Sequence, residues 1–506
     1  MNTKMTNPWV RTHTEVLDQR ALPMPAAWQG ARAQRLPTSE IGHSIHVSGN
    51  QGALRAELIA LLDQAVDMAV ICSFLIADPV FEAALKATAE RGVRVYVMVA
   101  SEARLGREPN QGEFDQKTHA HHKAMLKALG KSVLFRTAAH FHAKVVLIDP
   151  YTRPAGILLT ANLTEGALTR NEELAVRLSP TQAEGIAGYL RWAMWQTAEH
   201  ELLDGHDFKT AKPVNGVQHP APQAGICATT AEHKGIAEHL LYALNNASTQ
   251  IIISSFGWDL RHPVVELLCQ RAREGLKVTV LARIRPSVMP ALLALAESGA
   301  QVHGFKWLHA KALWTDAGNA MVMSANLEPH GLDDSFELGA LLDTRQAEEL
   351  KQRLLHWQAV APWHLLPAPT LGDLSGEVQL WRNGQLDQIQ ILTVAEVNLG
   401  EVVAESAHRL EAPRPEVSKP SQSNEPAHLL TCNWTVTAPY SNPKASPHMR
   451  PAQGKEKPRP YTPNVLREPG GRLTVAISQP GELDSAVQLL GEIGAAAVVI
   501  DSRSRQ

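Results

Sequence analysis

The pattern of apolar and polar positions becomes a regular alternation of helix and strand from about Ala53 onward. Apolar residues recur at helical spacing over 53–66, and the short apolar run 68–74 predicts a buried strand. A second helix is predicted over 78–92, ending at Gly92, and residues 93–100 predict the next strand. Strands that alternate with helices are typical of an α/β fold.

The same order of elements returns about 180 residues later, as a helix–strand–helix–strand pattern over 231–282. Residues 71–74 (ICSF) match 253–256 (ISSF), and residues 89–99 (AERGVRVYVMV) match 272–281 (AREGLKVTVL). The chain therefore contains an internal duplication. We place the first repeat at 41–200, a connector at 201–224 and the second repeat at 225–362.

The two ends of the chain follow other patterns. Residues 1–40 have little periodicity and are expected to be a loose N-terminal lead-in. Residues 363–411 predict a possible short β module, and the proline-rich stretch 412–470 predicts a flexible linker. Residues 471–506 predict a small βαβ-like piece, too short to hold a core alone and so expected to dock on another part.

Composition narrows the class of protein. With 48 basic and 51 acidic side chains the formal charge is −3, which excludes a protein that coats nucleic acid by bulk charge. Four distant cysteines with no CxxC pair argue against a disulfide scaffold and a cysteine zinc site. No stretch approaches the roughly 18 apolar residues of a membrane span, and the first residues lack a signal-peptide pattern. We expect a cytoplasmic protein without an integral membrane segment.

Each repeat carries the same polar motif in its second half. A His-Ala-Lys triplet is followed by Asp, then by Thr/Ser-Ala-Asn, and eleven residues after the Asn by Glu. The members are His142, Lys144, Asp149, Thr160, Asn162 and Glu173 in the first repeat, and His309, Lys311, Asp316, Ser324, Asn326 and Glu337 in the second. If each triplet begins a strand, its His and Lys point to the same face, and the two sets are expected to meet in one site with twofold pseudosymmetry.

A phosphodiester is the substrate that suits these groups. Lysine and asparagine donors stabilise the negative charge that gathers on phosphoryl oxygens during displacement. One neutral imidazole attacks phosphorus, and a protonated one donates to the leaving oxygen and later activates water. Each glutamate is a candidate to hold the ring nitrogen that does not react. The scheme requires no metal and no cofactor.

At these residues the chain resembles the phospholipase D superfamily, whose signature is HxK, four residues, Asp, a G-S-x-N-type strand and a downstream Glu. Leu159 and Met323 stand where Gly is common, and Thr160 replaces Ser. The resemblance implies two tandem phospholipase D-like α/β sandwich repeats that form a pseudodimer. It also implies His142 as nucleophile and His309 as general acid, with supporting roles for the two aspartates.

The superfamily resemblance leaves the substrate open. We favour a nuclease acting on DNA or RNA, because the stretch 101–124 between two predicted strands of the first repeat is highly polar rather than apolar. By analogy with stand-alone proteins of this type, we expect it to act in a DNA-processing or phage-defence complex. The alternatives are a phospholipase D or transphosphatidylase that acts on phospholipid, as cardiolipin synthases do, and a weakly active nucleic-acid-binding module. The C-terminal extension suits contact with a protein partner.

Overall fold

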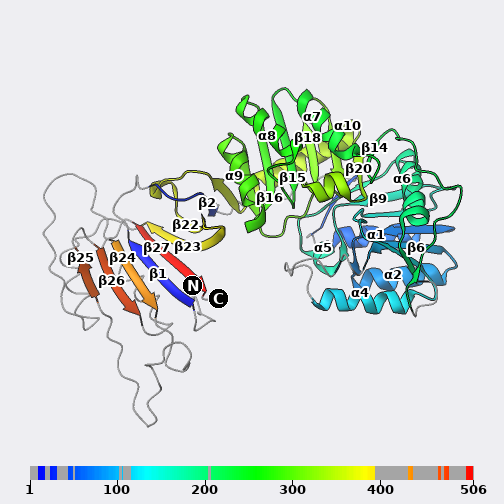
Figure 1. Cartoon of the computed structure of the whole chain (residues 1–506), viewed down its shortest axis with the longest axis horizontal. Helices are drawn as coiled ribbons and strands as arrows, with labels where there is room; N and C mark the ends of the chain where they lie inside the picture. Colours follow the sequence, from blue (N-terminus) through cyan, green and yellow to red (C-terminus); the bar gives the residue numbers. More distant parts are fainter. Residues whose placement is uncertain are drawn as a thin grey trace, which may run out of the picture. The chain divides into compact units, whose positions relative to one another are not determined.

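The computed structural model describes residues 10–16, 23–30, 44–48, 52–101, 105, 116–202, 207–393, 431–436, 465–468, 472–477 and 497–504. The chain forms two units (Figure 1). One is Ala33–Pro362, and the other combines Met1–Arg32 with Trp363–Gln506. The first of these contains both predicted repeats and every residue of the predicted site.

The first repeat is built on a sheet whose central strands are parallel. In spatial order its strands are β13 (Lys209–Thr210), β12 (His200–Leu202), β7 (Leu134–Ala138), β6 (Arg94–Ala100), β4 (Met68–Cys72), β8 (Val145–Ile148), β9 (Ala155–Leu159), β11 (Leu174–Arg177) and β3 (Ile45–Val47). The strands β4, β6 and β7 run parallel, and β8 and β9 return antiparallel. A further short pair is β5 (Ile76–Ala77) with β10 (Leu163–Thr164). The helices are α1 (Ala53–Asp63), α2 (Pro79–Glu90), α4 (Gln116–Leu129), α5 (Glu165–Thr169) and α6 (Pro180–Trp192), which continues as a π-helical turn, Ala193–Thr197.

The second repeat has the same strand order. Its strands are β17 (Gln301–Phe305), β16 (Lys277–Arg283), β15 (Gln250–Ser255), β18 (Ala312–Thr315), β19 (Ala320–Met323), β20 (Glu337–Leu341) and β14 (Ile226–Thr229). They correspond one by one to β7, β6, β4, β8, β9, β11 and β3. The helices are α7 (Gly235–Asn246), α8 (Pro263–Arg273), α9 (Met289–Glu297) and α10 (Thr344–Val360), with a 3-10 turn at Pro286–Val288 and a π-helical turn at His330–Asp334. The predicted α/β fold class is confirmed.

Two capping boxes tie the repeats together. Ser179 caps α6 and Asp343 caps α10, each with a glutamine three residues on that bonds back to the cap. The side-chain amide of Gln182 also donates to the carbonyl oxygen of Leu341 (2.8 Å) in the second repeat. In the same way Gln346 donates to the carbonyl of Arg177 (2.9 Å) in the first. The helix α6 of the first repeat is therefore hydrogen-bonded to the sheet of the second repeat, and α10 of the second repeat to the sheet of the first.

A continuous apolar core also joins the repeats. It contains buried residues of both, among them Phe141 and Trp192 from the first and Phe336 and Trp357 from the second. The rings of Phe141 and Phe336 stack with centroids 5.0 Å apart. Burying one large apolar side chain stabilises a fold by roughly 1.5–3 kcal/mol, so this shared core fixes the repeats against each other.

The second unit is built from strands at both ends of the chain. One set lies in the order β1 (Val10–Val16), β27 (Ala497–Ser504), β23 (Gln385–Thr393), β22 (Gly376–Arg382), β2 (Ala27–Gly30) and β21 (Trp363–Leu366), and a second in the order β24 (Thr431–Val436), β26 (Arg472–Ile477) and β25 (Val465–Glu468). A 3-10 turn, Leu371–Asp373, precedes β22. Among the described helices, none is both long enough and apolar enough to cross a membrane.

Two expectations for the ends of the chain need correction. The lead-in 1–40 supplies two strands, and Trp28 in β2 is fully buried. The stretch 412–470, expected to be a flexible linker, contains β24 and β25. The strands β1 and β24 are rich in Val and Thr and pair with strands that are not adjacent in sequence, which local proline content does not reveal. The helix expected within 471–506 falls at 478–496, outside the described residues.

Candidate active site

Backbone hydrogen bonds between the repeats bring His142 beside Glu337. The amide of His142 donates to the carbonyl of Phe336 (3.1 Å), and the amide of Phe336 donates to the carbonyl of His140 (2.6 Å). Glu337 follows Phe336 directly, at the start of β20. As a result Nδ1 of His142 lies 2.5 Å from Oε1 of Glu337.

The second histidine is held by the equivalent contacts of the other half-site. The amide of His309 donates to the carbonyl of Glu172 (2.9 Å), and the amide of Glu172 to the carbonyl of Trp307 (3.3 Å). The next residue, Glu173, then places its two carboxylate oxygens 2.9 and 3.1 Å from Nδ1 of His309. Each predicted histidine thus pairs with the predicted glutamate of the other repeat.

The hydroxyl of each motif holds the glutamate of its own repeat. Thr160 donates through Oγ1 to Oε2 of Glu173 (2.6 Å) and accepts the amide of Leu174 (2.9 Å). Ser324 donates to Oε2 of Glu337. Both glutamates are completely buried. The hydroxyl therefore orients the carboxylate, and the carboxylate orients the imidazole across the interface.

Both motif lysines are fully buried beside their histidines. Lys144 donates through Nζ to the carbonyl of His142, and Lys311 donates to the carbonyl of His309 at 2.6 Å. We expected the His-Ala-Lys triplets to lie within strands, and this expectation is wrong. The strand β8 begins only at Val145 and β18 only at Ala312, so each triplet precedes its strand. In each triplet the backbone forms hydrogen bonds with the other repeat, in place of the hydrogen bonds that a strand makes with its neighbour in a sheet.

The two motif asparagines differ in their surroundings. The Oδ1 atoms of Asn162 and Asn326 are both buried and accept no hydrogen bond from the described residues. The amide nitrogen Nδ2 of Asn326 donates to Glu328 at 3.1 Å. Each Oδ1 therefore keeps capacity to accept a hydrogen bond, and only the amide nitrogen of each asparagine can donate to a phosphoryl oxygen.

The two motif aspartates lie at the ends of β8 and β18 and bind backbone. Asp149 is buried, has a positive φ of 46° and accepts the amides of Val66, Asp67 and Met68. Burial alone raises the pKa of Asp149, but these donors outweigh it and hold the pKa below its ordinary value. Asp316 accepts the equivalent amides of Ser248, Thr249 and Gln250. Both aspartates thus bind the backbone that leads into β4 or β15.

The charges of the two His–Glu pairs are unequal. Burial holds the pKa of His142 well below its ordinary value, although Glu337 opposes the shift. Burial acts to raise the pKa of Glu337, but the charge of His142 and a hydrogen bond from it lower the pKa overall. For Glu173 burial prevails over Lys311 and raises the pKa to about 7. Near neutral pH the first pair holds an ionised carboxylate, and the second can hold a proton.

Sequence reasoning missed two phenylalanines that contact the histidines. The ring of Phe74 meets His142 edge-on with centroids 5.3 Å apart, and Phe256 meets His309 at 4.8 Å. The preceding serines, Ser73 and Ser255, accept the amides that follow Asn162 and Asn326. The signal was present in the matching ICSF and ISSF stretches, which we used only to establish the duplication.

A group of cations and aromatic rings adjoins His309. Arg283 lies 5.2 Å from the centroid of Phe256 and 5.1 Å from that of Trp307. Arg285 lies 4.2 Å from Phe256, and Arg170 lies 3.9 Å from Trp307. At the position of Arg283 the first repeat has Ala100. A comparison of the two repeats, position by position, reveals this difference from sequence alone.

A family comparison covers most of the first repeat. Residues 58–192 match the family model described as "Cardiolipin synthase, PLD-like domain". No curated protein matches the chain.

Solved structures with a similar fold come from several bacteria. The polyphosphate kinase of Porphyromonas gingivalis is 14% identical over 62% of this chain and 50% of its own, with a TM-score of 0.42, so the chain spans about half the length of that kinase. Phosphatidylserine synthase of Haemophilus influenzae is 11% identical over 70% of this chain and 91% of its own, with a TM-score of 0.48. The phospholipase D family member Nuc of Salmonella typhimurium is 22% identical over 31% of this chain and 95% of its own, with a TM-score of 0.25.

Proposed function

We propose that this chain, a member of the phospholipase D superfamily, cleaves the phosphodiester bonds of DNA or RNA through a phosphohistidine intermediate. The observation that carries the proposal is the crossed pairing of His142 with Glu337 and of His309 with Glu173. Each glutamate occupies Nδ1, so Nε2 is the ring nitrogen that reacts. Two imidazoles held in this way supply a nucleophile and a proton donor.

His142 is the proposed nucleophile. Its low pKa leaves the ring neutral, and its Nε2 lone pair attacks phosphorus to form an N–P bond. The bond from phosphorus to the leaving oxygen breaks, and that oxygen takes a proton from His309. The proton is available because the pKa of Glu173, which faces His309, is raised to about 7.

Water completes the reaction by the reverse use of the same groups. His309 takes a proton from water while the water oxygen attacks phosphorus. The N–P bond breaks and its electron pair returns to Nε2 of His142. Lys144 and Lys311 stabilise the charge on the phosphoryl oxygens, since a buried ammonium acts in a medium of low effective dielectric constant. The amides of Asn162 and Asn326 are proposed to donate to the same oxygens.

The cations and rings beside His309 support nucleic acid as the substrate. Trp307 and Phe256 are half-buried, so each keeps part of its ring accessible, and the guanidinium groups of Arg285 and Arg170 lie over them. Positive charge attracts a phosphate backbone, and aromatic or guanidinium planes stack with bases. The nearly neutral overall charge of the chain is compatible with such a local groove.

Phospholipid is the second candidate substrate. It is favoured by the description of the matching family model, a cardiolipin synthase domain. The same two histidines would perform the same displacement on a phospholipid headgroup. The substrate test therefore contains a lipid arm.

The proposal extends to the setting of the enzyme. We place it in the cytoplasm, in a DNA-processing or phage-defence complex, with a protein partner bound through the C-terminal extension. The strands that residues 363–393 and 497–504 contribute to the second unit support a folded extension. Cell fractionation followed by affinity purification of the full chain, with and without residues 394–506, tests both parts.

A degradation assay in EDTA tests the reaction. Single- and double-stranded DNA and RNA are incubated with the wild type, His142→Ala, His309→Ala and the control His200→Ala, which changes an exposed histidine of β12. We expect cleavage by the wild type and by the control alone. Activity that disappears in EDTA and returns with magnesium would contradict the mechanism.

Two further outcomes of this assay point to a contaminant or to a lipid substrate. Cleavage by all four proteins would assign the activity to a contaminant or to another site and overturn the proposal. If none cleaves nucleic acid, the same proteins are incubated with phosphatidylcholine and phosphatidylglycerol vesicles. Headgroup release that requires both histidines would replace nucleic acid with lipid as substrate and leave the chemistry in place.

A further inference from the structure

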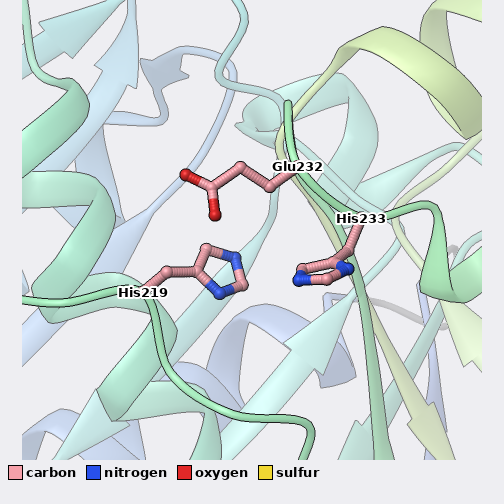
Figure 2. A group of neighbouring side chains, drawn as sticks. All are labelled: His219, Glu232 and His233. Atoms are coloured by element: carbon pink, nitrogen blue, oxygen red, sulfur yellow. The ribbon is translucent and has the colours of Figure 1, made fainter.

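A second group of side chains that bind metals lies outside the candidate active site. Its members are His219 in the connector and Glu232 and His233 in the turn between β14 and α7. One ligand atom from each of the three lies within 4.8 Å of the others. Figure 2 shows the three side chains turned toward one another from two separate segments of backbone.

The donor set suits zinc. Imidazole nitrogen and carboxylate oxygen are zinc ligands, and three of them with one water complete a tetrahedron. Two ligand atoms at about 2.1 Å from zinc in a tetrahedron are about 3.4 Å apart. The observed limit of 4.8 Å exceeds that tetrahedral spacing by about 1.4 Å. Glu232 and His233 are exposed and His219 is half-buried, so an ion reaches them from solvent.

The protein already holds these ligands in place. Nε2 of His219 lies 3.2 Å from Oγ1 of Thr230, and the same oxygen accepts the backbone amides of Glu232 and His233 at 3.2 Å each. The ring of His219 also meets Trp192 edge-on, with centroids 4.7 Å apart. The hydroxyl of Thr230 thus contacts the ring of His219 and also holds the backbone of the turn that carries Glu232 and His233.

The cluster joins parts of both repeats. His219 packs on Trp192 at the end of α6 in the first repeat, whereas His233 belongs to the second. Trp192 stacks with Phe336 at 6.2 Å, and Phe336 immediately precedes Glu337 of the candidate active site. A bound ion would fasten the connector to the second repeat beside the core that aligns the two His–Glu pairs.

We propose that His219, Glu232 and His233 form a zinc site that clips the connector to the second repeat. The site is structural. It contributes to the stability of the paired repeats and supplies no group to phosphodiester cleavage. The proposal is therefore independent of the proposed function.

Zinc binding to the full-length, tag-free protein tests the site. We expect zinc chloride to bind at one equivalent in titration calorimetry and to raise Tm by about 5 °C at about 100-fold excess over Kd. His219→Ala, His233→Ala and Glu232→Gln each weaken binding at least tenfold and abolish the Tm shift. His200→Ala, an exposed histidine outside the cluster, binds as the wild type does. Unchanged zinc affinity in the three variants overturns the proposal.

Two further measurements separate this site from the active site. The double variant His142→Asn/His309→Asn keeps one equivalent of zinc and the full Tm shift. If that variant loses the zinc, the ion belongs to the catalytic histidines and the proposal is wrong. Because Glu232 and His233 are exposed, their variants are expected to fold, and circular dichroism of each checks this directly. Cobalt in place of zinc gives visible absorption bands that the His233→Ala variant lacks.

Discussion

The two histidines of the candidate site have the same backbone setting and different electrostatic surroundings. In each repeat a hydroxyl holds a glutamate, and that glutamate holds the histidine of the other repeat. Yet the pKa of Glu337 lies below its ordinary value, whereas the pKa of Glu173 is raised to about 7. A duplicated motif therefore supplies the geometry, and the residues around it make the pKa values of the two glutamates differ.

The difference continues in the residues next to each histidine. Phe74 beside His142 is buried, whereas Phe256 beside His309 is half-buried and carries Arg283 and Arg285 nearby. The ring that packs on His142 is therefore covered, whereas the ring beside His309 stays partly accessible and has two arginines near it. Cations near the leaving oxygen help to bind the nucleic-acid fragment that carries this oxygen. The presence of arginines beside His309 alone therefore fits the proposal of His142 as nucleophile and His309 as acid.

Exchange of each histidine tests this assignment with the largest expected effect. His142→Asn removes the nucleophile, and we expect kcat to fall by about 10⁴-fold with every substrate. His309→Asn removes the acid, and we expect a loss of about 10²- to 10⁴-fold with DNA. With a p-nitrophenyl phosphodiester, whose leaving group needs no proton, only His309→Asn recovers its first step and accumulates phosphohistidine. Alkaline quenching followed by mass spectrometry of the peptide detects it.

The opposite result would reverse the roles. If His142→Asn is the variant that the activated substrate rescues, His309 is the nucleophile and the pKa asymmetry has no part in choosing it. A comparison with His200→Ala, which should cleave both substrates at the wild-type rate, controls for handling and folding.

Replacing each glutamate with glutamine should distinguish the two His–Glu pairs by their loss of kcat, with smaller effects than replacing the histidines. Glu337 is ionised, so Glu337→Gln removes a working charge, and we expect kcat to fall by about 100-fold. Glu173 is half-protonated near pH 7, so Glu173→Gln resembles its neutral form and costs less than about tenfold. Wild-type activity should decline as pH rises through about 7, where Glu173 loses its proton. Glu173→Gln shifts this decline and Glu337→Gln does not.

The same titration has a consequence for stability. The folded pKa of Glu173, about 7, exceeds its value in the unfolded chain, so folding takes up a proton between about pH 4.5 and 7. The contribution of Glu173 is fully present below that window and falls by about 3 kcal/mol as pH rises through it. Urea unfolding of the wild type and of Glu173→Gln at pH 5 and pH 7.5 isolates this difference, because buried His142, with its lowered pKa, contributes the opposite trend in both proteins. An equal pH dependence in Glu173→Gln would show that another group is responsible.

Much of this site follows from the sequence because its chemistry is local and duplicated. The spacing from His142 to Lys144 and the spacing from Asn162 to Glu173 both recur in the second repeat, and the structure brings both sets to one interface. The family resemblance that these motifs predicted is confirmed over 58–192. The structural role of Asp149 follows too, since a carboxylate after a strand is well placed to accept nearby amides.

What the sequence does not reveal depends on contacts between distant segments. Which glutamate pairs with which histidine is decided by backbone bonding at Phe336 and Glu172, between segments far apart in the chain: the paired side chains are 195 and 136 residues apart. The strands β1 and β24 pair with partners far away, so local pattern misreads them. The zinc ligands His219 and His233 stand fourteen residues apart, a spacing that predicts no site by itself.

The cationic residues beside His309 offer a test with a moderate effect. We expect Arg285→Ala to raise KM for DNA about five- to tenfold at low salt and to leave kcat nearly unchanged. The slope of log KM against log salt concentration should fall by about one, the amount that corresponds to one lost phosphate contact. Lys277→Ala is the matched control, because Lys277 lies at the opposite end of β16 from Arg283 and is exposed. Equal effects of the two substitutions would mean that charge acts at long range, without a groove beside His309.

Substitutions of the two motif aspartates should have the smallest effect on turnover. Their effect on the free energy of unfolding instead compares the two repeats. Asp149 is buried and has a positive φ, so Asp149→Ala loses three amide bonds and strains the backbone, at about 3 kcal/mol. Asp316 is exposed, and Asp316→Ala should cost about 1 kcal/mol. The loss of stability in Asp149→Asn, which tolerates the positive φ, should lie between those of the two alanine variants.

Because the pKa of Asp149 is lowered in the folded protein, its contribution to stability is present above the unfolded pKa and disappears as pH falls through the folded pKa. Acid unfolding of the three variants measures this, and equal losses at Asp149 and Asp316 would show that burial does not distinguish the two repeats.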